Sequence, residues 1–274
     1  MTRLPVRLRA RIALGGCGLI LALVFIQGLA MRPGAWEPDF GAVNQPPSAA
    51  HFFGTDWLGR DMFSRTVKGL GTSVVIGAAA SLVSAVMAAV LGIGAAILGR
   101  KIDALVNGLV NLCMSVPHLV LLTLIAIAVG KGLSGVLIGV AATHWTSLAR
   151  VIRAEALALK NAPYIAAARS CGRGARWIAR KHILPHIVPQ FIVGCVLLFP
   201  HAILHEASIT FLGFGLSPEQ PAIGVILSES MRHLSSGLWW LAALPGLSLL
   251  VIVLLFDVLG EHLRILLNPG TAHT

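Results

Sequence analysis

The sequence has few charged residues, few aromatic residues and few cysteines. Only 12% of its 274 residues are charged and 6% are aromatic, with a single tyrosine, whereas ordinary soluble domains carry about 25% charged residues. The four cysteines show no CxxC spacing, which indicates neither a disulfide scaffold nor a zinc site. The chain is instead 56% hydrophobic, with a mean hydropathy of +0.84. This composition predicts an integral membrane protein.

Sequence motifs for common enzyme chemistry are missing as well. The chain has no phosphate loop of the form GxxxxGKS or GxxxxGKT, no GxSxG nucleophile elbow and no HExxH pair. The short run Gly130-Lys131-Gly132 has neither the spacing nor the hydroxyl residue of a phosphate loop. We therefore expect a chain that is not an enzyme and that binds no cofactor of its own.

The formal net charge of +10 does not indicate a nucleic-acid partner. The basic residues form short clusters beside apolar stretches, without interleaved aromatic residues. Clusters of this kind are typical of the cytoplasmic loops of membrane proteins. We expect the lipid bilayer, and no nucleic acid, as the environment of the chain.

Six apolar stretches are candidates for transmembrane helices, which need roughly 20 residues to cross a bilayer. The second is rich in Ala, Gly and Ser, a composition that lets helix backbones approach closely. The third contains Pro117, which predicts a kink because proline removes a backbone donor and clashes with the preceding turn. The expected spans are residues 12–30, 72–98, 105–129, 133–149, 187–204 and 238–259. The sequence thus predicts an all-α polytopic membrane protein of about six transmembrane helices.

The first stretch, residues 12–30, shares features with a secretory signal peptide. Arginines precede it, and Gly28-Leu29-Ala30 resembles a cleavage site. Its apolar core is longer than the roughly 7–15 residues of a signal peptide, so we expect an uncleaved first transmembrane helix.

The distribution of basic residues predicts the orientation of the chain. Most of the 21 Lys and Arg residues fall in the N-terminal segment, in the connection after the second stretch and in residues 150–189. The positive-inside rule places these segments in the cytoplasm. With an even number of spans, the N-terminal residues 1–11 and the tail 265–274 are both expected to be cytoplasmic.

Two segments on the expected outer side are too long to be simple turns. The first, residues 31–71, is punctuated by Gly and Pro and carries Trp57 and Phe63 beside charged residues, which predicts a loop with a short interfacial helix. The second, residues 207–237, is expected to enter the membrane as a re-entrant element, since irregular backbone is tolerated there where it lines a cavity. Residues 72–264 form the expected core transmembrane domain.

The basic segment 150–189 carries an Ala-Ala pair, then a glycine, then Leu-Pro. The positions are Ala167, Ala168, Gly172, Leu184 and Pro185, with Ala166 before the pair. In this order and spacing they resemble the EAA loop of permeases in ATP-binding-cassette (ABC) importers, with Ala166 standing where the family has glutamate. Gly172 also suits the end of one helix and the start of the next, because glycine readily takes the left-handed conformation.

Three further stretches follow one another in the order typical of one branch of this family. They are Gly54-Thr55-Asp56-Trp57-Leu58-Gly59-Arg60-Asp61, then Ile209-Thr210-Phe211-Leu212-Gly213-Phe214-Gly215, then Leu259-Gly260-Glu261-His262-Leu263-Arg264 followed by Asn268-Pro269. Together they resemble the second permease of each pair in the dipeptide, oligopeptide and nickel importers. The resemblance covers nearly the whole chain.

The resemblance implies a type I ABC importer permease fold and several partner chains. The expected partners are a homologous second permease, two ATPase subunits that use ATP and Mg²⁺, and an external solute-binding protein. The chain would supply half of the pathway in the bacterial cytoplasmic membrane, and residues 150–189 would couple it to the ATPase. The alternative is a channel or sensor outside this class, which would need no ATPase partner and would tolerate loss of the turn at Gly172.

Histidines near the expected spans bear on the solute. His201 and His205 stand one helical turn apart beside Glu206, and His144 precedes Trp145 in the fourth stretch. Imidazoles at this spacing can share a transition metal such as nickel, and ionisable groups inside a membrane are candidates for function. Taken singly, each histidine is better explained by a hydrogen bond within the bundle. As a set they favour nickel or a metal chelate over di- and oligopeptides, and no metal ligand is firmly assigned.

Overall fold

The computed structural model describes residues 6–31 and 33–267, and this part of the chain contains α-helices and no β-strand. Five helices are long and apolar enough to cross a membrane, and a sixth span results if the bent pair α3 and α4 counts as one. The prediction of an all-α protein of about six transmembrane helices is confirmed. The α-helices are α1 (Val6–Ala30), α2 (Met62–Ile97), α3 (Arg100–Ser115), α4 (His118–Val129), α5 (Leu133–Lys160), α6 (Pro163–Ser170), α7 (Ala175–Ile178), α8 (Leu184–Phe211), α9 (Ile223–Met231) and α10 (Trp240–Leu267).

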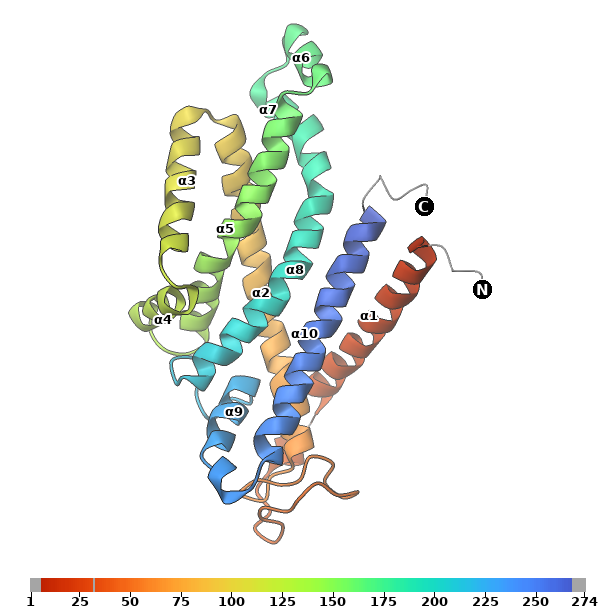
Figure 1. Cartoon of the computed structure of the whole chain (residues 1–274), viewed down its shortest axis with the longest axis vertical. Helices are drawn as coiled ribbons and strands as arrows, with labels where there is room; N and C mark the ends of the chain where they lie inside the picture. Colours follow the sequence, from red (N-terminus) through yellow and green to blue (C-terminus); the bar gives the residue numbers. More distant parts are fainter. Residues whose placement is uncertain (1–5, 32, 268–274) are drawn as a thin grey trace.

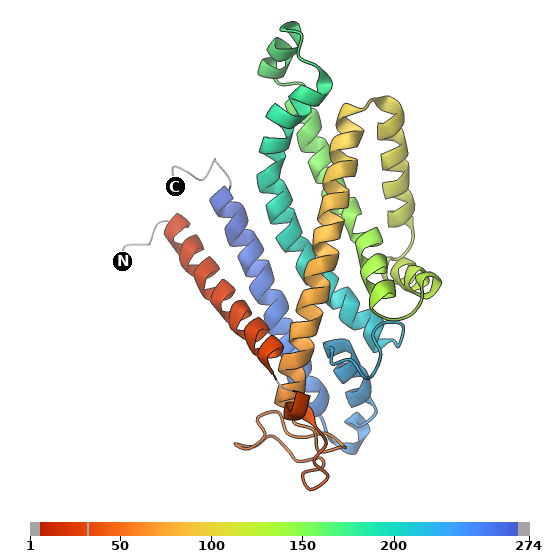
Figure 2. The same cartoon turned by 180° about the vertical axis from the view of Figure 1, so that it is seen from behind.

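The long helices lie side by side along the long axis of the molecule (Figure 1). At one end, α6 and α7 project beyond the bundle, and α1 begins and α10 ends toward that same end. The opposite end holds α9 and the loop that joins α1 to α2. Figure 2 shows α2 running the length of the bundle, with α1 and α10 to one side of it and α3 to the other.

The loop expected over residues 31–71 is shorter in the structure, because α2 begins at Met62. Asp61 caps this helix, and its side chain accepts a hydrogen bond of 2.8 Å from the backbone N–H of Ser64. Arg65 and Lys68 lie outside the apolar stretch, but they belong to the first turns of the helix. In place of the expected interfacial helix, the loop has a single turn of 3-10 helix at Pro33–Trp36 and a series of turns.

The third expected span is divided at Pro117 into α3 and α4, whose axes differ by 100°. Val116 has an extended backbone with ψ 137°, as is usual for the residue before a proline. The expected kink is therefore a complete change of direction, which turns α4 across the bundle (Figure 1).

Two other helices continue beyond their apolar stretches. α5 runs on to Lys160, and α8 begins at Leu184 and ends at Phe211. On the extension of α5, the guanidinium of Arg153 pairs with Asp103 of α3 at 2.5 and 2.6 Å. Because Arg153 is paired with Asp103 within the protein, α5 can continue as a helix beyond the apolar stretch.

Small residues form the contact between α2 and α5. A β-carbon added at Gly92 of α2 would lie 2.8 Å from the carbonyl oxygen of Ala149 in α5, and Ala88 one turn earlier is fully buried. A second contact of this kind joins α1 to α2, where Gly28 faces Gly71. Helix backbones approach this closely only where side chains are small.

We expect Gly92→Ala to destabilise the protein through this contact. The added methyl group has to push α2 and α5 apart, and overpacking of this kind lowers the free energy of unfolding by about 1–3 kcal/mol. Gly94→Ala is the matched control, since its β-carbon meets only the Leu98 side chain, at 3.7 Å. Thermal denaturation in detergent should show a lower Tm for Gly92→Ala than for Gly94→Ala, and equal Tm values would contradict the role of this contact.

Candidate functional site

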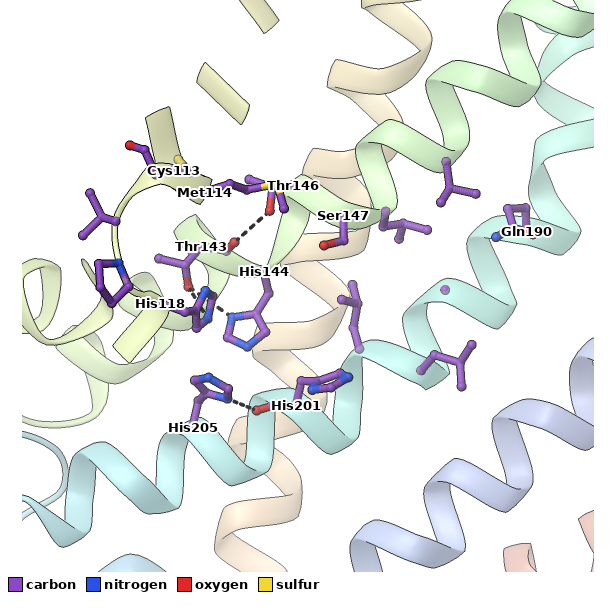
Figure 3. Close-up of a pocket in the computed structure, with 18 residues that line it drawn as sticks. Cys113, Met114, His118, Thr143, His144, Thr146, Ser147, Gln190, His201 and His205 are labelled. Carbon is purple, nitrogen blue, oxygen red and sulfur yellow. Dashed lines mark hydrogen bonds between the residues drawn. The ribbon is translucent and has the colours of Figure 1, made fainter. Parts of the chain in front are cut away.

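A cavity of about 840 Å³ lies between α5, α8 and the break between α3 and α4 (Figure 3). Among the described residues that line it there is no Asp, Glu, Lys or Arg. Its polar and sulfur-containing side chains are Cys113, Met114, Ser115, His118, Thr143, His144, Thr146, Ser147, Gln190, His201 and His205. A cavity with convergent polar groups inside an apolar bundle is a candidate binding site.

Three histidines from three helices converge on this cavity. His118 begins α4, His144 lies in α5 and His205 lies in α8. The ring centroids are 4.5, 4.6 and 4.9 Å apart, and the rings of each pair are nearly perpendicular, at 86°, 89° and 87°. One ring nitrogen from each histidine can be chosen so that all three lie within 4.8 Å of one another. We call these three residues the histidine cluster.

Backbone carbonyl groups orient two rings of the cluster. His144 Nδ1 lies 2.9 Å from the carbonyl oxygen of Val140, and His205 Nδ1 lies 2.8 Å from the carbonyl oxygen of His201. A carbonyl only accepts, so the Nδ1–H of each neutral ring donates. Each acceptor is one turn earlier on the same helix, which leaves the Nε2 atom of each ring without a bond to its own helix.

The approach of α8 to its neighbours positions His205. Gly194 of α8 lies so close to Leu148 of α5 that an added β-carbon would overlap the leucine side chain. At Gly77 of α2, a β-carbon would lie 3.1 Å from the ring of Phe199 in α8. These glycine contacts hold the middle of α8 against α2 and α5 and bring its histidines to the cavity.

The other residues predicted from the sequence occupy different places. His201 lines the cavity, but its ring stands outside the histidine cluster and its carbonyl group orients His205. Glu206 is fully buried and does not line the cavity; its Oε1 accepts a hydrogen bond of 3.0 Å from the hydroxyl of Thr210. His118 is absent from the predicted residues. Its only sequence signal is the preceding Pro117, which marks the break that points α4 into the site.

The predicted motif at residues 54–61 forms a buried ionic network at the end of the bundle that holds α9. The Oδ2 atom of the fully buried Asp56 lies 2.7 Å from Arg60 Nε and 2.7 Å from Arg65 Nη1. Arg65 Nη2 in turn lies 2.7 Å from a carboxylate oxygen of Glu229 in α9. The network joins the loop, the start of α2 and α9.

The remaining residues of this motif shape the backbone. Gly54 and Gly59 have φ of 71° and 75°, and a β-carbon at Gly54 would lie 2.5 Å from the carbonyl oxygen of Gln45. Thr55 and Asp61 form an antiparallel bridge, so the motif closes on itself just before α2. The motif builds a fixed turn around the ionic network and presents no reactive centre.

The second predicted outer motif ends α8. Phe211 is the last residue of the helix, Leu212 caps it, and Gly213 takes a left-handed conformation with φ 84°. The chain then returns through α9, within the segment expected to be re-entrant. Gly224 of α9 approaches α8 closely, since its β-carbon would lie 2.5 Å from the carbonyl oxygen of Ala207.

The segment 150–189 contains two short helices, α6 and α7, joined through Gly172. This glycine has φ 74°, its N–H donates to the carbonyl of Arg169 at 2.9 Å, and the N–H of Arg173 donates to the carbonyl of Ala168 at 3.1 Å. This pair of hydrogen bonds is the Schellman motif, which requires a left-handed residue at the position of Gly172.

The two short helices divide into a buried and an exposed side. Ile165 is fully buried, whereas Ala166 and Ala167 are exposed. Leu184 and Pro185 follow a π-helical turn at Ala179–Ile183, so α7, this turn and α8 form one continuous helix from Ala175 to Phe211. The loop thus has an apolar anchor and an exposed surface of small side chains.

Comparison with known proteins identifies the family of the chain. Residues 88–264 match the family described as binding-protein-dependent transport system inner membrane component. The chain belongs to this family. It is 34% identical over 259 residues to a putative peptide transport system permease protein of Brucella suis, covering 92% of this chain and 86% of that protein. It is 33% identical over 226 residues to the dipeptide transport system permease protein DppC of Bacillus subtilis, covering 82% of this chain and 71% of that protein.

A solved structure supports the fold of this permease. A chain of the MetNI methionine ABC transporter, in an inward-facing conformation, matches 76% of this chain and 98% of its own length, with a TM-score of 0.60 and 18% sequence identity. The predictions of a permease of the dipeptide and oligopeptide type and of a type I ABC importer fold are confirmed.

We expect Arg65→Ala to destabilise the permease more than any loss of a surface charge. The substitution removes one partner from each of two short ion pairs, and breaking a buried pair costs about 3–5 kcal/mol. Arg264→Ala is the control because Arg264 is exposed and lies 3.9 Å from Glu261, so its loss should change the free energy of unfolding by less than about 0.5 kcal/mol. Thermal denaturation of the two variants in the same detergent checks this, and similar Tm values would show that the network contributes little.

Proposed function

We propose that the chain is one of the two homologous permeases of an ATP-driven importer and that its cavity is part of the solute pathway. The observation that carries this proposal is the cavity itself, a hollow of about 840 Å³ with polar and apolar walls within a bundle of membrane-spanning helices. Its volume falls in the range of about 300–1,000 Å³ common for small-molecule sites. The second permease would complete the pathway.

The loop formed by α6, Gly172 and α7 is the proposed contact with the ATPase subunit. It projects beyond the bundle at one end (Figure 1), and it offers the exposed Ala166 and Ala167 to a partner. Its buried Ile165 and Ile178 pack in the same core cluster as Ile152 of α5. A displacement of the loop would therefore be passed to α5 and α8, which carry two residues of the histidine cluster.

The position of the loop also supports the proposed orientation. The ends of α1 and α10 lie toward the side of α6 and α7, so both termini would face the cytoplasm together with the ATPase. The ionic network and α9 would then face the solute-binding protein on the outer side. The solutes proposed for this pathway are di- or oligopeptides, after the names of the relatives, or a metal chelate of similar size.

Gly172→Val should uncouple ATP hydrolysis from uptake without preventing membrane insertion. A β-branched residue strains the left-handed conformation by about 1–2 kcal/mol and opens the turn between α6 and α7. Gly174→Val is the matched control: both glycines have open space around them, but Gly174 has φ −73°. We expect Gly172→Val to reduce solute uptake per ATP hydrolysed, and Gly174→Val to leave this ratio unchanged.

The measurement is solute uptake and ATPase activity in vesicles that contain the complete importer. Normal coupling in Gly172→Val, with the variant present in the membrane at normal amount, would argue against a coupling role for this loop.

A further inference from the structure

We propose that His118, His144 and His205 form a binding site for one divalent transition-metal ion. The metal would be cargo that passes through the cavity, so the chain would transport a metal carried by small ligands. The assignment as cargo rests on the proposed function, whereas the binding site rests on the geometry of the cluster alone.

The environment of His144 is the strongest evidence for a metal site. The residue is only 6% exposed, and its Nδ1–H donates to the carbonyl oxygen of Val140. Its Nε2 is therefore the unprotonated nitrogen of the neutral ring, with a lone pair directed away from that bond. In the described part of the chain this buried Nε2 has no hydrogen-bond partner. Buried polar atoms are nearly always paired, so an unpaired acceptor at a cavity wall points to a ligand.

His205 offers the same kind of ligand nitrogen, and His118 offers a third imidazole without a backbone carbonyl to orient it. His205 is oriented by the carbonyl oxygen of His201, which leaves its Nε2 free in the same way as that of His144. His118 lies opposite, with its Nε2 3.4 Å from the hydroxyl of Thr143, a contact long enough to let the ring turn. A backbone carbonyl bonded to the distal nitrogen is the arrangement that commonly orients metal-binding histidines.

The spacing of the nitrogens is close to that of a bound metal. Three ring nitrogens lie within 4.8 Å of one another. Nitrogen ligands at about 2.0–2.1 Å from a tetrahedral metal are about 3.4 Å apart, so the gap closes through small rotations of the rings.

The donor set selects the class of metal. Imidazole nitrogen suits nickel, copper, zinc and iron, whereas Mg²⁺ and Ca²⁺ take oxygen ligands. No carboxylate is among the described residues that line the cavity, and Cys113 and Met114 on its wall add sulfur donors. The cavity is also far larger than a bare ion. The three histidines would occupy one face of the metal, and a small chelator or water would fill the remaining coordination positions.

The test is metal binding by the full-length chain, purified in detergent with an affinity tag that contains no histidine. Co²⁺ serves as a spectroscopic probe because nitrogen ligation gives it visible absorption bands, and Ni²⁺ competes for the same site. We expect one strong site per chain, with affinity reduced by on the order of 100-fold in His118→Ala, His144→Ala and His205→Ala.

Two control variants distinguish metal binding at the histidine cluster from metal binding at other histidines of the chain. His201→Ala keeps the backbone carbonyl that orients His205, and His233→Ala removes a ring that stacks on Trp57 at the far end of the bundle. Both should bind Co²⁺ as the unaltered chain does. If His144→Ala folds poorly, His118→Ala and His205→Ala still test the site, because both side chains are only half-buried. The Tm of each of these variants is compared with that of the unaltered chain. Absence of a strong site in the unaltered chain, or equal affinity in all variants, would overturn the proposal.

Uptake assays then distinguish failure of this inference from failure of the proposed function. In vesicles with the complete importer, ATP-dependent uptake of radioactive nickel should fall at least tenfold in His205→Ala and stay unchanged in His262→Ala, since His262 of α10 does not line the cavity. ATP-dependent peptide uptake that is equal in both variants, without nickel uptake, would refute the metal cargo and retain the importer. Metal binding without ATP-dependent uptake of any solute would instead refute the importer.

Discussion

The close contact between α2 and α5 is the interaction on which the rest of the structure depends. Without water inside a bilayer, helices associate through packing of small residues rather than through the hydrophobic effect. Gly92 lets the backbone of α5 lie against α2, and Gly77 and Gly194 let α8 join them. These three helices form a rigid centre. The cavity exists because the chain turns by 100° at Pro117, so that α4 does not fill the space beside this centre.

The same arrangement links the two ends of the molecule. α5 and α8 run without interruption from the cavity to the segment 161–183 that contains α6 and α7, so each has one end at the proposed ATPase contact. At the opposite end, the ionic network around Asp56 ties the start of α2 to α9. A bundle whose long helices join a short-helix segment at one end and an ionic network at the other is suited to a transporter in which helices tilt as units.

Much of the fold could be predicted from the sequence, but the composition of the site could not. The apolar stretches located the spans, and the glycine within the basic segment located the left-handed turn, because both depend on local sequence. The start of α2 was missed because hydropathy does not detect the capping of a helix by Asp61. The spacing of His201 and His205 places them on one face of α8, yet the cluster takes His118 from another helix. Only the turn at Pro117 brings that residue close, and its angle is set by tertiary packing.

The central claim is that the segment with α6 and α7 contacts an ATPase on the cytoplasmic side. The most direct measurement is photo-crosslinking in intact membranes, with a photoreactive amino acid at the exposed position 167 and, for comparison, at the exposed position 48 in the opposite loop. The account predicts that position 167 crosslinks to a protein with a phosphate-binding loop and that position 48 does not. Crosslinks to such a protein from position 48, or from neither position, would contradict it.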